Sequence, residues 1–397
     1  MTVIRNDKTQ IPHIVWDELQ LAVNNSQRVR GLTHEFYKYP ARFSPVFAGK
    51  AIELLSNPQD IVLDPYVGGG TSIVEGWVRN RQMIGTDVNE LAIFSAKAKT
   101  TILKADDLRV VNDWLENVVP KLKCNNSCRL ELSTPGKYGM NLNLRNSRHT
   151  KPLVQQALGT IGHLSSERAR CFLRMVVLKT TQLAWDGRKK TIDASSYRKL
   201  LRKNLLAMLD GMQEFDQAMK SVDKRKKPKL LHLNADSLSL RNVGNKKVDL
   251  VITSPPYPGV HVLYHRWQID GRKESQAPYW ISGCEDGHAT DYYTFGGRQS
   301  KAGIDKYFDT AQRTHEAIRS VMNKNAYFIQ LVGFNNKKQQ LNRYLECMSN
   351  AGFDEATREG SQRQSRLWRK VPNRKWYTRF TDTSSSSKEV ALIHVAR

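Results

Sequence analysis

The chain has 397 residues, of which 62 are Lys or Arg and 38 are Asp or Glu, so its formal net charge at pH 7 is +24. A surface this basic should attract a polyanion, with an affinity that falls steeply as salt rises. A membrane anchor is the competing explanation, but no apolar stretch reaches the ~18 residues of a spanning helix, and the N-terminus lacks a signal-peptide pattern.

The first part of the chain predicts a parallel α/β unit. Residues 1–30 are polar, and we assign them to an N-terminal arm. Strand, turn and helix patterns alternate over 31–104, beginning with a short buried strand at 61–65 and a Gly-rich turn at 66–71. Glycines after a strand let the backbone turn sharply and approach a ligand, and Thr71 is placed to cap the following helix.

A second strand, Gln82 to Asp87, ends in an acid 23 residues after Asp64. An acid at this place suits the hydroxyl groups of a ribose. The glycine spacing does not satisfy GxGxxG, which disfavours a nicotinamide enzyme. The alternative role for Asp87 is to cap a helix or turn.

Residues 105–228 predict a helical, basic insertion. Apolar residues recur there at helical spacing, and one example is the set Leu201, Leu205, Met208, Leu209 and Met212. A loop-like segment begins at Asn125, and the basic run 224–229 closes the insertion. Such a run is usually a solvated face, but it could also hold a phosphate backbone.

Cysteine usage indicates ordinary thiols. The five cysteines, at 124, 128, 171, 284 and 347, are sparse and odd in number, which fits a reducing compartment. Cys124 and Cys128 are four residues apart, but no second pair or nearby His completes zinc spacing. We therefore predict no metal.

The α/β pattern resumes over 229–397. Leu231 to Asp236 predicts a strand with the acid at its carboxyl end, and 248–253 predicts another. Ligands collect outside the carboxyl ends of strands in open α/β sheets. The side chains that follow these strands should therefore converge, namely Asp64, Asp87, Asp236 and Ser254.

The tetrapeptide Ser254, Pro255, Pro256 and Tyr257 closes the strand at 248–253. Consecutive prolines fix φ and have no N–H, so the backbone offers carbonyl oxygens, while Ser254 adds an acceptor and Tyr257 a stacking face. Such a stiff pocket suits a planar ring that bears an amino group. A simple turn after a buried strand is the alternative.

The segment 258–303 mixes aromatic with basic residues, a pattern that favours contact with nucleic acid over a regular core. A loop packed over the sheet is the alternative. A helix at 304–322, a strand at 326–333 and a terminal antiparallel hairpin with a basic loop follow. The candidate DNA-binding residues are Arg266, Trp267, Arg272, Arg298, Lys301 and Arg374.

Three segments resemble those of the amino-directed DNA methyltransferases that use S-adenosylmethionine, particularly the N4-cytosine type. They are 39–45, DPYVGGGT at 64–71 and SPPY at 254–257; Tyr66 replaces the usual Phe, and Gly69 the Ser. The resemblance implies that Asp87 binds the ribose and Asp236 lies near the cofactor's adenine amino group. The implied cofactor-binding residues are Tyr39, Pro40, Phe43, Asp64, Tyr66, Gly68, Gly70, Thr71, Asp87 and Asp236, and the implied catalytic residues are Ser254, Pro255, Pro256 and Tyr257.

The resemblance also implies a fold and a reaction. The fold is a Rossmann-like, mostly parallel sheet with a C-terminal antiparallel hairpin and a helical insertion. The reaction is methyl transfer from S-adenosylmethionine to N4 of a cytosine flipped out of double-stranded DNA, in restriction-modification beside a cognate endonuclease or in epigenetic marking. The expected location is the bacterial or archaeal cytoplasm, near the nucleoid.

Three alternatives stay open. Methylation of adenine N6 requires the same kind of pocket, and Ser at the first position favours cytosine only by family resemblance. An RNA amino-methyltransferase is more distant, because no RNA-binding module is recognisable. A catalytically silent DNA-binding protein is the alternative from another class. The Pro-Cys pair that cytosine C5 enzymes commonly carry is absent.

Overall fold

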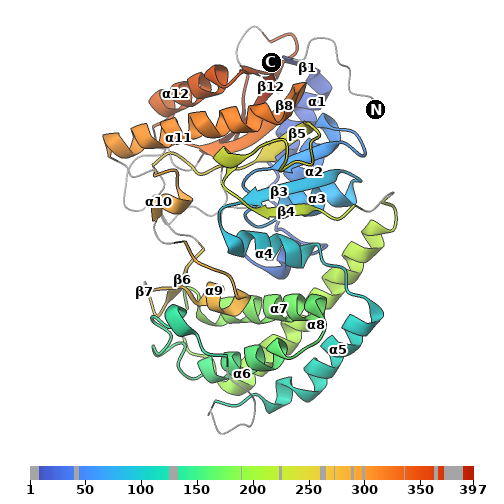
Figure 1. The fold of residues 1–397 in the computed structure, drawn as a ribbon, viewed down its shortest axis with the longest axis vertical. Helices are drawn as coiled ribbons and strands as arrows, with labels where there is room; N and C mark the ends of the chain where they lie inside the picture. The colour runs from blue at the N-terminus through green and yellow to red at the C-terminus, as the bar shows by residue number, and fades with distance from the viewer. Residues whose placement is uncertain are drawn as a thin grey trace.

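A mostly parallel eight-stranded sheet lies at the centre of the fold (Figure 1). The computed structural model describes residues 9–39, 44–124, 133–188, 190–222, 226–259, 265–271, 273–287, 290–296, 300–334, 336–361, 365–370 and 388–397. The strand order is β11-β12-β8-β5-β2-β3-β4, and β9 pairs with β12. The strands are β2 (Ile61–Asp64), β3 (Gln82–Asp87), β4 (Lys229–His232), β5 (Val248–Thr253), β8 (Met322–Gly333), β9 (Phe353–Glu355), β11 (Leu367–Lys370) and β12 (Lys388–Ala396).

The order of the strands creates a switch point between β2 and β5. From β2 the chain adds β3 and β4 on one side, then returns to place β5 and β8 on the other side, and these five strands are parallel. β12 runs antiparallel to β8 and to β11. The predicted α/β class and the C-terminal antiparallel hairpin are confirmed. Ligands collect at such a switch point, outside the carboxyl ends of the strands.

Both faces of the sheet are covered, so its central strands bury apolar side chains on both sides. On β2, Val62 belongs to the cluster beneath one helical layer, and its neighbour Leu63 belongs to the cluster beneath the other. The same alternation separates Leu250 from Val251 on β5, as the two-residue period of a strand requires. The helices are α1 (His13–Val23), α2 (Pro45–Leu55) and α3 (Thr71–Val78) on the first face, and α11 (Lys301–Ser320) and α12 (Lys337–Asn350) on the second.

The N-terminal arm packs against the rest of the fold through residues 9–23. A short strand, β1 (Gln10–Ile11), pairs with β10 (Thr357–Arg358) near the end of the chain. Helix α1 follows and buries Trp16 and Leu19. Burial of these large side chains gives the arm a structural role in the sheet half.

A helical lobe lies beyond the β4 edge of the sheet (Figure 1). As predicted, the part of 105–228 that is described is helical. The lobe contains α5 (Ala105–Asn117), η2 (Val119–Lys121), η3 (Gly136–Tyr138), α6 (Lys151–Gly162), α7 (Glu167–Trp185) and α8 (Ala194–Met219). A later segment joins it, with β6 (Trp267–Ile269), β7 (Lys273–Ser275) and α9 (Ala277–Ser282). This segment packs on α7, although the sequence placed it in the catalytic half.

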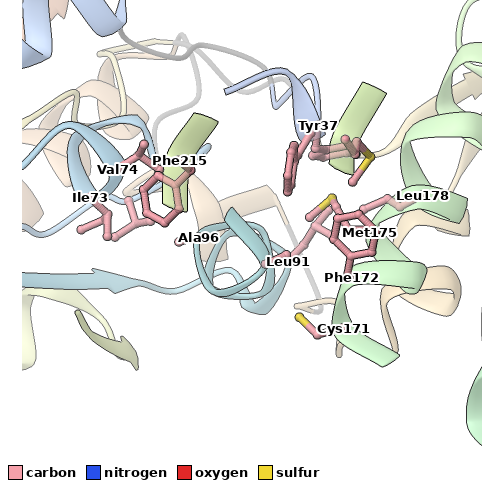
Figure 2. Packing of buried hydrophobic residues seen from close by; sticks show 14 of the residues in the cluster. Tyr37, Ile73, Val74, Leu91, Ala96, Cys171, Phe172, Met175, Leu178 and Phe215 are labelled. Carbon is pink, nitrogen blue, oxygen red and sulfur yellow. The ribbon is translucent and has the colours of Figure 1, made fainter. Parts of the chain in front are cut away.

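Helix α4 (Glu90–Lys99) joins the lobe to the sheet half (Figure 2). Its Leu91 and Ala96 lie between Ile73 and Val74 of α3 on one side and Phe172 of α7 on the other. All five side chains belong to one buried apolar cluster. The two parts of the molecule therefore share a core. No helix in the described part of the chain is both long and apolar enough to cross a membrane.

Candidate active site

The Gly-rich turn after β2 needs glycine at two positions. Gly68 and Gly70 have φ values of 48° and 74°, in the left-handed region that disfavours other residues. A Cβ added at Gly70 would lie 2.9 Å from Cα of Ala96 on α4. Gly70 is the N-cap of α3, and Thr71 is the helix's first residue. The predicted cap at Thr71 is therefore wrong, because the left-handed glycine already ends the turn.

Helix α4 also holds the turn through a buried lysine. Lys99 is 0% exposed, and its Nζ donates a hydrogen bond to the carbonyl oxygen of Gly69 at 2.6 Å. The sequence analysis missed this residue. The available signal was a second lysine, at 99, beside the alanines at 96 and 98, on a helix that directly follows the acidic strand end.

Asp87 lies at the end of β3, where the sequence placed it. Its side chain accepts hydrogen bonds from the backbone N–H groups of Gly68 at 2.9 Å and Asn89 at 2.8 Å. Burial raises the pKa of this carboxyl to about 6, although both hydrogen bonds lower it. Asp87 thus caps the turn.

Tyr39 lies over the glycine turn and is tied to Asn89. A Cβ added at Gly68 would lie 3.5 Å from Cε1 of Tyr39, and the Tyr39 hydroxyl accepts a hydrogen bond from Asn89 Nδ2 at 3.1 Å. The hydroxyl of Tyr279 on α9 donates to Asn89 Oδ1, also at 3.1 Å. Asn89, which the sequence analysis missed, therefore links the N-terminal segment, the turn and the helical lobe. Pro40 and Phe43 lie outside the described residues.

Asp64 supports the turn from beneath. Oδ1 accepts hydrogen bonds from the Tyr66 N–H at 3.0 Å and from Thr253 Oγ1 at 2.6 Å, and Oδ2 accepts one from Ser72. The carboxyl is 1% exposed, and burial raises its pKa to about 6. Three donors already use its oxygens, so the geometry favours a supporting role over direct contact with a cofactor.

The tetrapeptide after β5 presents acceptors at the switch point. Ser254 Oγ donates its proton to the Leu331 carbonyl at 3.0 Å. One of its two lone pairs can accept from the Tyr257 hydroxyl at 3.3 Å, and the other is left as an acceptor. The Tyr307 hydroxyl donates to the Pro256 carbonyl at 2.7 Å. Among the described residues, no hydrogen bond reaches the Pro255 carbonyl. Two acceptors, Ser254 Oγ and Pro255 O, are thereby available in consecutive residues.

Tyr257 is anchored beside these acceptors. Its hydroxyl lies 3.3 Å from Ser254 Oγ, and its ring lies against Gly333 at the end of β8. Burial raises the pKa of the hydroxyl far above its usual range, and the nearby Glu389 carboxylate adds to this. Tyr257 is therefore neutral at pH 7.

Three of the predicted positions are joined around the Gly-rich turn at the carboxyl ends of the strands, namely Asp64, Asp87 and, through Thr253, Ser254. Burial raises the pKa of the Tyr66 hydroxyl well above its usual value, and the carboxylates of Asp236, Asp87 and Asp64 raise it further. Asp64 in turn accepts a hydrogen bond from Thr253, the residue that precedes Ser254. The predicted strand does not reach Asp236, because β4 ends at His232 and Asp236 lies in η4 (Ala235–Ser237).

The predicted DNA contacts differ in their exposure and in their partners. Trp267 is 1% exposed, packs edge-on against Trp185 and donates to the Tyr37 hydroxyl at 3.1 Å, so its prediction as a DNA contact is wrong. Arg266 bonds Asp286 at 2.8 Å and Glu274 at 2.6 Å, which commits its guanidinium to internal ion pairs. Lys301 is exposed in the first turn of α11. Arg272, Arg298 and Arg374 lie outside the described residues.

The basic run at 224–229 is far from this crevice. Its described part, Lys226 to Lys229, leads into the beginning of β4, at the edge of the sheet opposite the carboxyl ends. Lys226 contacts the side chain of Gln82, the first residue of β3. The run therefore does not line the candidate site. Within the described ranges, no three His, Cys, Asp or Glu side chains are grouped to hold a metal ion.

The fold and the site together define a Rossmann-like protein with a Gly-rich turn after β2 beside the tetrapeptide that follows β5. Residues 4–98 match the DNA methylase family N6_N4_Mtase. A stretch of 120 residues is 35% identical to the Type II methyltransferase M.MvaI of Kocuria varians, covering 27% of this chain and 26% of that protein. The predicted resemblance to amino-directed DNA methyltransferases is thereby confirmed for the matched region. The chain spans about a quarter of the length of this relative.

Comparison with solved structures gives weak likenesses. TrmN from Thermus thermophilus matches with a TM-score of 0.33 and 12% identity, over 92% of this chain and 53% of that one. The rRNA methyltransferase aviRa from Streptomyces viridochromogenes matches with a TM-score of 0.35 and 9% identity, over 99% and 94%. Scores this low support no statement about function.

The family match implies S-adenosylmethionine as the cofactor, and the residues present fit it. The left-handed glycines bring backbone, rather than side chain, to the end of β2. The carboxylate of Asp87 lies at the turn, where it could accept hydrogen bonds from the two hydroxyl groups of a ribose. Tyr39 of the N-terminal segment lies against the same turn. A buried acid next to bare backbone is the arrangement that a nucleoside requires.

Proposed function

We propose that the chain is a DNA methyltransferase that transfers a methyl group from S-adenosylmethionine to N4 of a cytosine flipped out of the duplex. The observation that carries the proposal is the position of Ser254 and Pro255 directly after Thr253, whose hydroxyl bonds to Asp64 beside the Gly-rich turn. The cofactor supplies an activated methyl group when bound.

The protein's part in the reaction is to polarise and orient the amine. An exocyclic amine is conjugated with its ring and is a poor nucleophile until acceptors draw on its N–H groups. Ser254 Oγ, with its own proton committed to Leu331, and Pro255 O are placed as such acceptors. Fixed acceptors of this kind need no reorganisation during reaction, and correct placement supplies much of the rate gain.

Tyr257 is proposed to stack on the flipped base. A base inside a duplex cannot reach the crevice, so it must leave the stack and find a new aromatic neighbour. The Tyr257 ring is held by Gly333 and by its hydroxyl beside Ser254, which preorganises it. No covalent intermediate with the enzyme is required.

Double-stranded DNA is the proposed partner, and the basic helical lobe is the proposed region of sequence recognition. Exposed cations lie on the lobe, among them Lys199 and Lys203 of α8, and Lys301 lies at the start of α11. Deletion or exchange of 125–220 with no change in sequence preference would contradict this assignment. A companion endonuclease, and hence a role in restriction-modification, is part of the proposal.

The proposed roles cover the residues predicted from the sequence, with the changes described above. The cofactor-contacting set is Tyr39, Pro40, Phe43, Tyr66, Gly68, Gly70, Thr71, Asp87 and Asp236, supported by Asp64, and the acceptor pocket is Ser254 to Tyr257. Among the candidate DNA contacts, Lys301, Arg272, Arg298 and Arg374 stay in the proposal.

Nucleoside mass spectrometry on DNA from cells that express the chain tests the proposal, beside cells that express Ser254→Ala. N4-methylcytosine that appears only with the unaltered chain is the expected result, and sequencing of the modified sites would give the recognition sequence. N6-methyladenine would keep the mechanism and overturn the choice of base, since the same acceptors would serve either amine.

Absence of any new base would overturn the proposed activity on DNA. Calorimetric titration with S-adenosylmethionine would then separate two remaining classes. Heat of binding would redirect the search to RNA amino-methylation, whereas no heat under conditions suited to a micromolar binder would favour a silent DNA-binding protein.

A further inference from the structure

We infer that Thr253 is a positioning residue that fixes the acceptor pocket relative to the cofactor turn through Asp64. The inference rests on the proposed methyl transfer and adds a residue to it. Thr253 is the last residue of β5, directly before Ser254, and is 0% exposed. Its Oγ1 donates a hydrogen bond of 2.6 Å to Asp64 Oδ1. A bond from a buried hydroxyl to a carboxylate is among the stronger hydrogen bonds in proteins.

The bond spans the place where two central strands separate. The paired residues of β2 and β5 are Val62 with Leu250 and Leu63 with Val251. Asp64 and Thr253 come after these pairs, at the carboxyl ends that form the crevice. The side-chain bond therefore continues the connection between the strands beyond their backbone ladder, at the base of the proposed site.

One carboxylate joins the parts on both sides of the crevice. Besides Thr253, Asp64 accepts hydrogen bonds from the Tyr66 N–H in the turn and from the Ser72 hydroxyl in the first turn of α3. The donors thus come from β5, from the Gly-rich turn and from α3. Movement of the tetrapeptide relative to the turn would require at least one of these buried bonds to break.

This arrangement predicts an effect on rate rather than on cofactor binding. The turn, Asp87 and Asn89 keep their own hydrogen bonds if Thr253 loses its hydroxyl. The acceptors at Ser254 and Pro255 would lose their tie to that turn. A misplacement of about 1 Å can lower a reaction rate by about a hundredfold. Loss of the hydroxyl should therefore lower the rate of methyl transfer more than the affinity for the cofactor.

The test compares Thr253→Val, which keeps the shape and removes the hydroxyl, with Thr253→Ser, which keeps the hydroxyl. Thr181→Val is the matched control, because Thr181 is also 0% exposed and its hydroxyl bonds the Tyr197 hydroxyl at 2.8 Å within the helical lobe. Three quantities are measured for each protein: the Kd of S-adenosylhomocysteine by calorimetry, the thermal unfolding midpoint, and the single-turnover rate of methyl transfer to DNA well below that midpoint.

Thr253→Val should lower the single-turnover rate by about tenfold or more while the Kd for S-adenosylhomocysteine changes by less than about threefold. Thr253→Ser should restore the rate to within about threefold of the unaltered chain, and Thr181→Val should lower only the unfolding midpoint. Thr253→Cys, a weaker donor of similar volume, replaces Thr253→Val if the latter does not fold. The same result is expected for it, namely a lower rate with a nearly unchanged Kd.

Two results would overturn the inference while the proposed function stands. One is a rate for Thr253→Val within about twofold of an active unaltered chain, which would leave Thr253 a purely structural role. The other is an equal loss of rate and of S-adenosylhomocysteine affinity, which would assign Thr253 to cofactor binding. A chain that binds S-adenosylhomocysteine but methylates no DNA would instead overturn the proposed function, and the inference with it.

Discussion

The ring of Tyr257 lies against Gly333, such that a Cβ added to the glycine would stand 2.9 Å from both Cδ2 and Cε2 of the ring. Real Cβ atoms do not approach this closely, so Gly333→Ala must displace the ring or the end of β8. The expected result is a fall of about tenfold or more in the rate of base methylation, because the misplaced group is the proposed stacking partner. The Kd of S-adenosylhomocysteine should stay unchanged.

Gly162→Ala is the control for this substitution. Gly162 is the last residue of α6, and a Cβ there would meet nothing within 4 Å. The control should leave both the rate and the Kd unaltered and should stabilise the helix slightly, since glycine is a poor helix former. Equal rates of methylation for Gly333→Ala and the unaltered chain would show that Tyr257 does not stack on the base.

Cofactor affinity should depend on pH through Asp87. Burial raises the pKa of this carboxyl to about 6, so the carboxylate becomes protonated between pH 7 and pH 5. The proposed hydrogen bonds from ribose hydroxyls are strongest to the ionised form. The Kd of S-adenosylhomocysteine, measured by calorimetry from pH 8 to pH 5, should therefore rise as pH falls through 6.

Protonation of Asp87 does not itself destabilise the fold over this pH range. A carboxyl whose pKa is raised in the folded state contributes stability that is fully present below its unfolded pKa, near 3.8, and is lost as pH rises through 6. Between pH 8 and pH 5 this group therefore stabilises the fold as the solution becomes more acidic. Asp87→Asn should give weaker binding with a flatter pH profile, and an unchanged profile would assign the titration to Asp64, whose pKa is also about 6.

Much of the fold could be predicted because its central strands are short apolar runs that end in polar residues. The runs at 61–64, 82–87 and 248–253 are buried on both faces, and a parallel sheet is the structure that such runs form. The strand ending at Asp236 was wrong by several residues. β4 is an edge strand with only partial burial, so tertiary pairing rather than apolar pattern decides where it ends.

The site was predictable where backbone chemistry dictates a residue type, as at Gly68, Gly70 and the prolines after Ser254. It was not predictable where a side chain acts through a partner far away in the sequence. Asn89, Lys99 and Thr253 carry no motif of their own. Their roles arise from packing that brings them to Tyr39, Gly69 and Asp64, respectively.

The Tyr279 hydroxyl should connect the helical lobe to cofactor binding. It donates to Asn89 Oδ1, and Asn89 in turn bonds Tyr39 and, through its N–H, Asp87. Tyr279→Phe removes this donor together with the longer contact of the same hydroxyl with the Tyr293 hydroxyl at 3.4 Å, so we expect a loss of about 1 kcal/mol in the free energy of unfolding. The Kd of S-adenosylhomocysteine should rise by about three- to tenfold, since 1.4 kcal/mol corresponds to tenfold in affinity.

Tyr197→Phe is the matched control, because the Tyr197 hydroxyl bonds Thr181 inside the lobe and none of the cofactor-side residues. Its cost in stability should be similar, at about 1 kcal/mol, with no change in the Kd. Equal Kd values for Tyr279→Phe and the unaltered chain would show that the lobe and the cofactor site are joined in structure only.

Arg266 and Lys301 were predicted alike as DNA contacts, and the structure now predicts opposite consequences for them. Arg266 is ion-paired with Asp286, whose side chain is 1% exposed. Arg266→Gln leaves that carboxylate buried without its cation, so the free energy of unfolding should fall by about 3 kcal/mol. The DNA affinity of the folded fraction should hardly change.

Lys301→Gln should leave the fold unaffected and weaken DNA binding, because Lys301 is exposed in the first turn of α11. Its effect on stability should stay within about 0.5 kcal/mol, while the slope of log K against log salt for DNA binding should decrease by about 1. Fluorescence anisotropy over a salt series, beside chemical unfolding of both variants, measures these quantities. A reduced salt slope for Arg266→Gln at unchanged stability would return Arg266 to the DNA-binding surface and contradict its structural role.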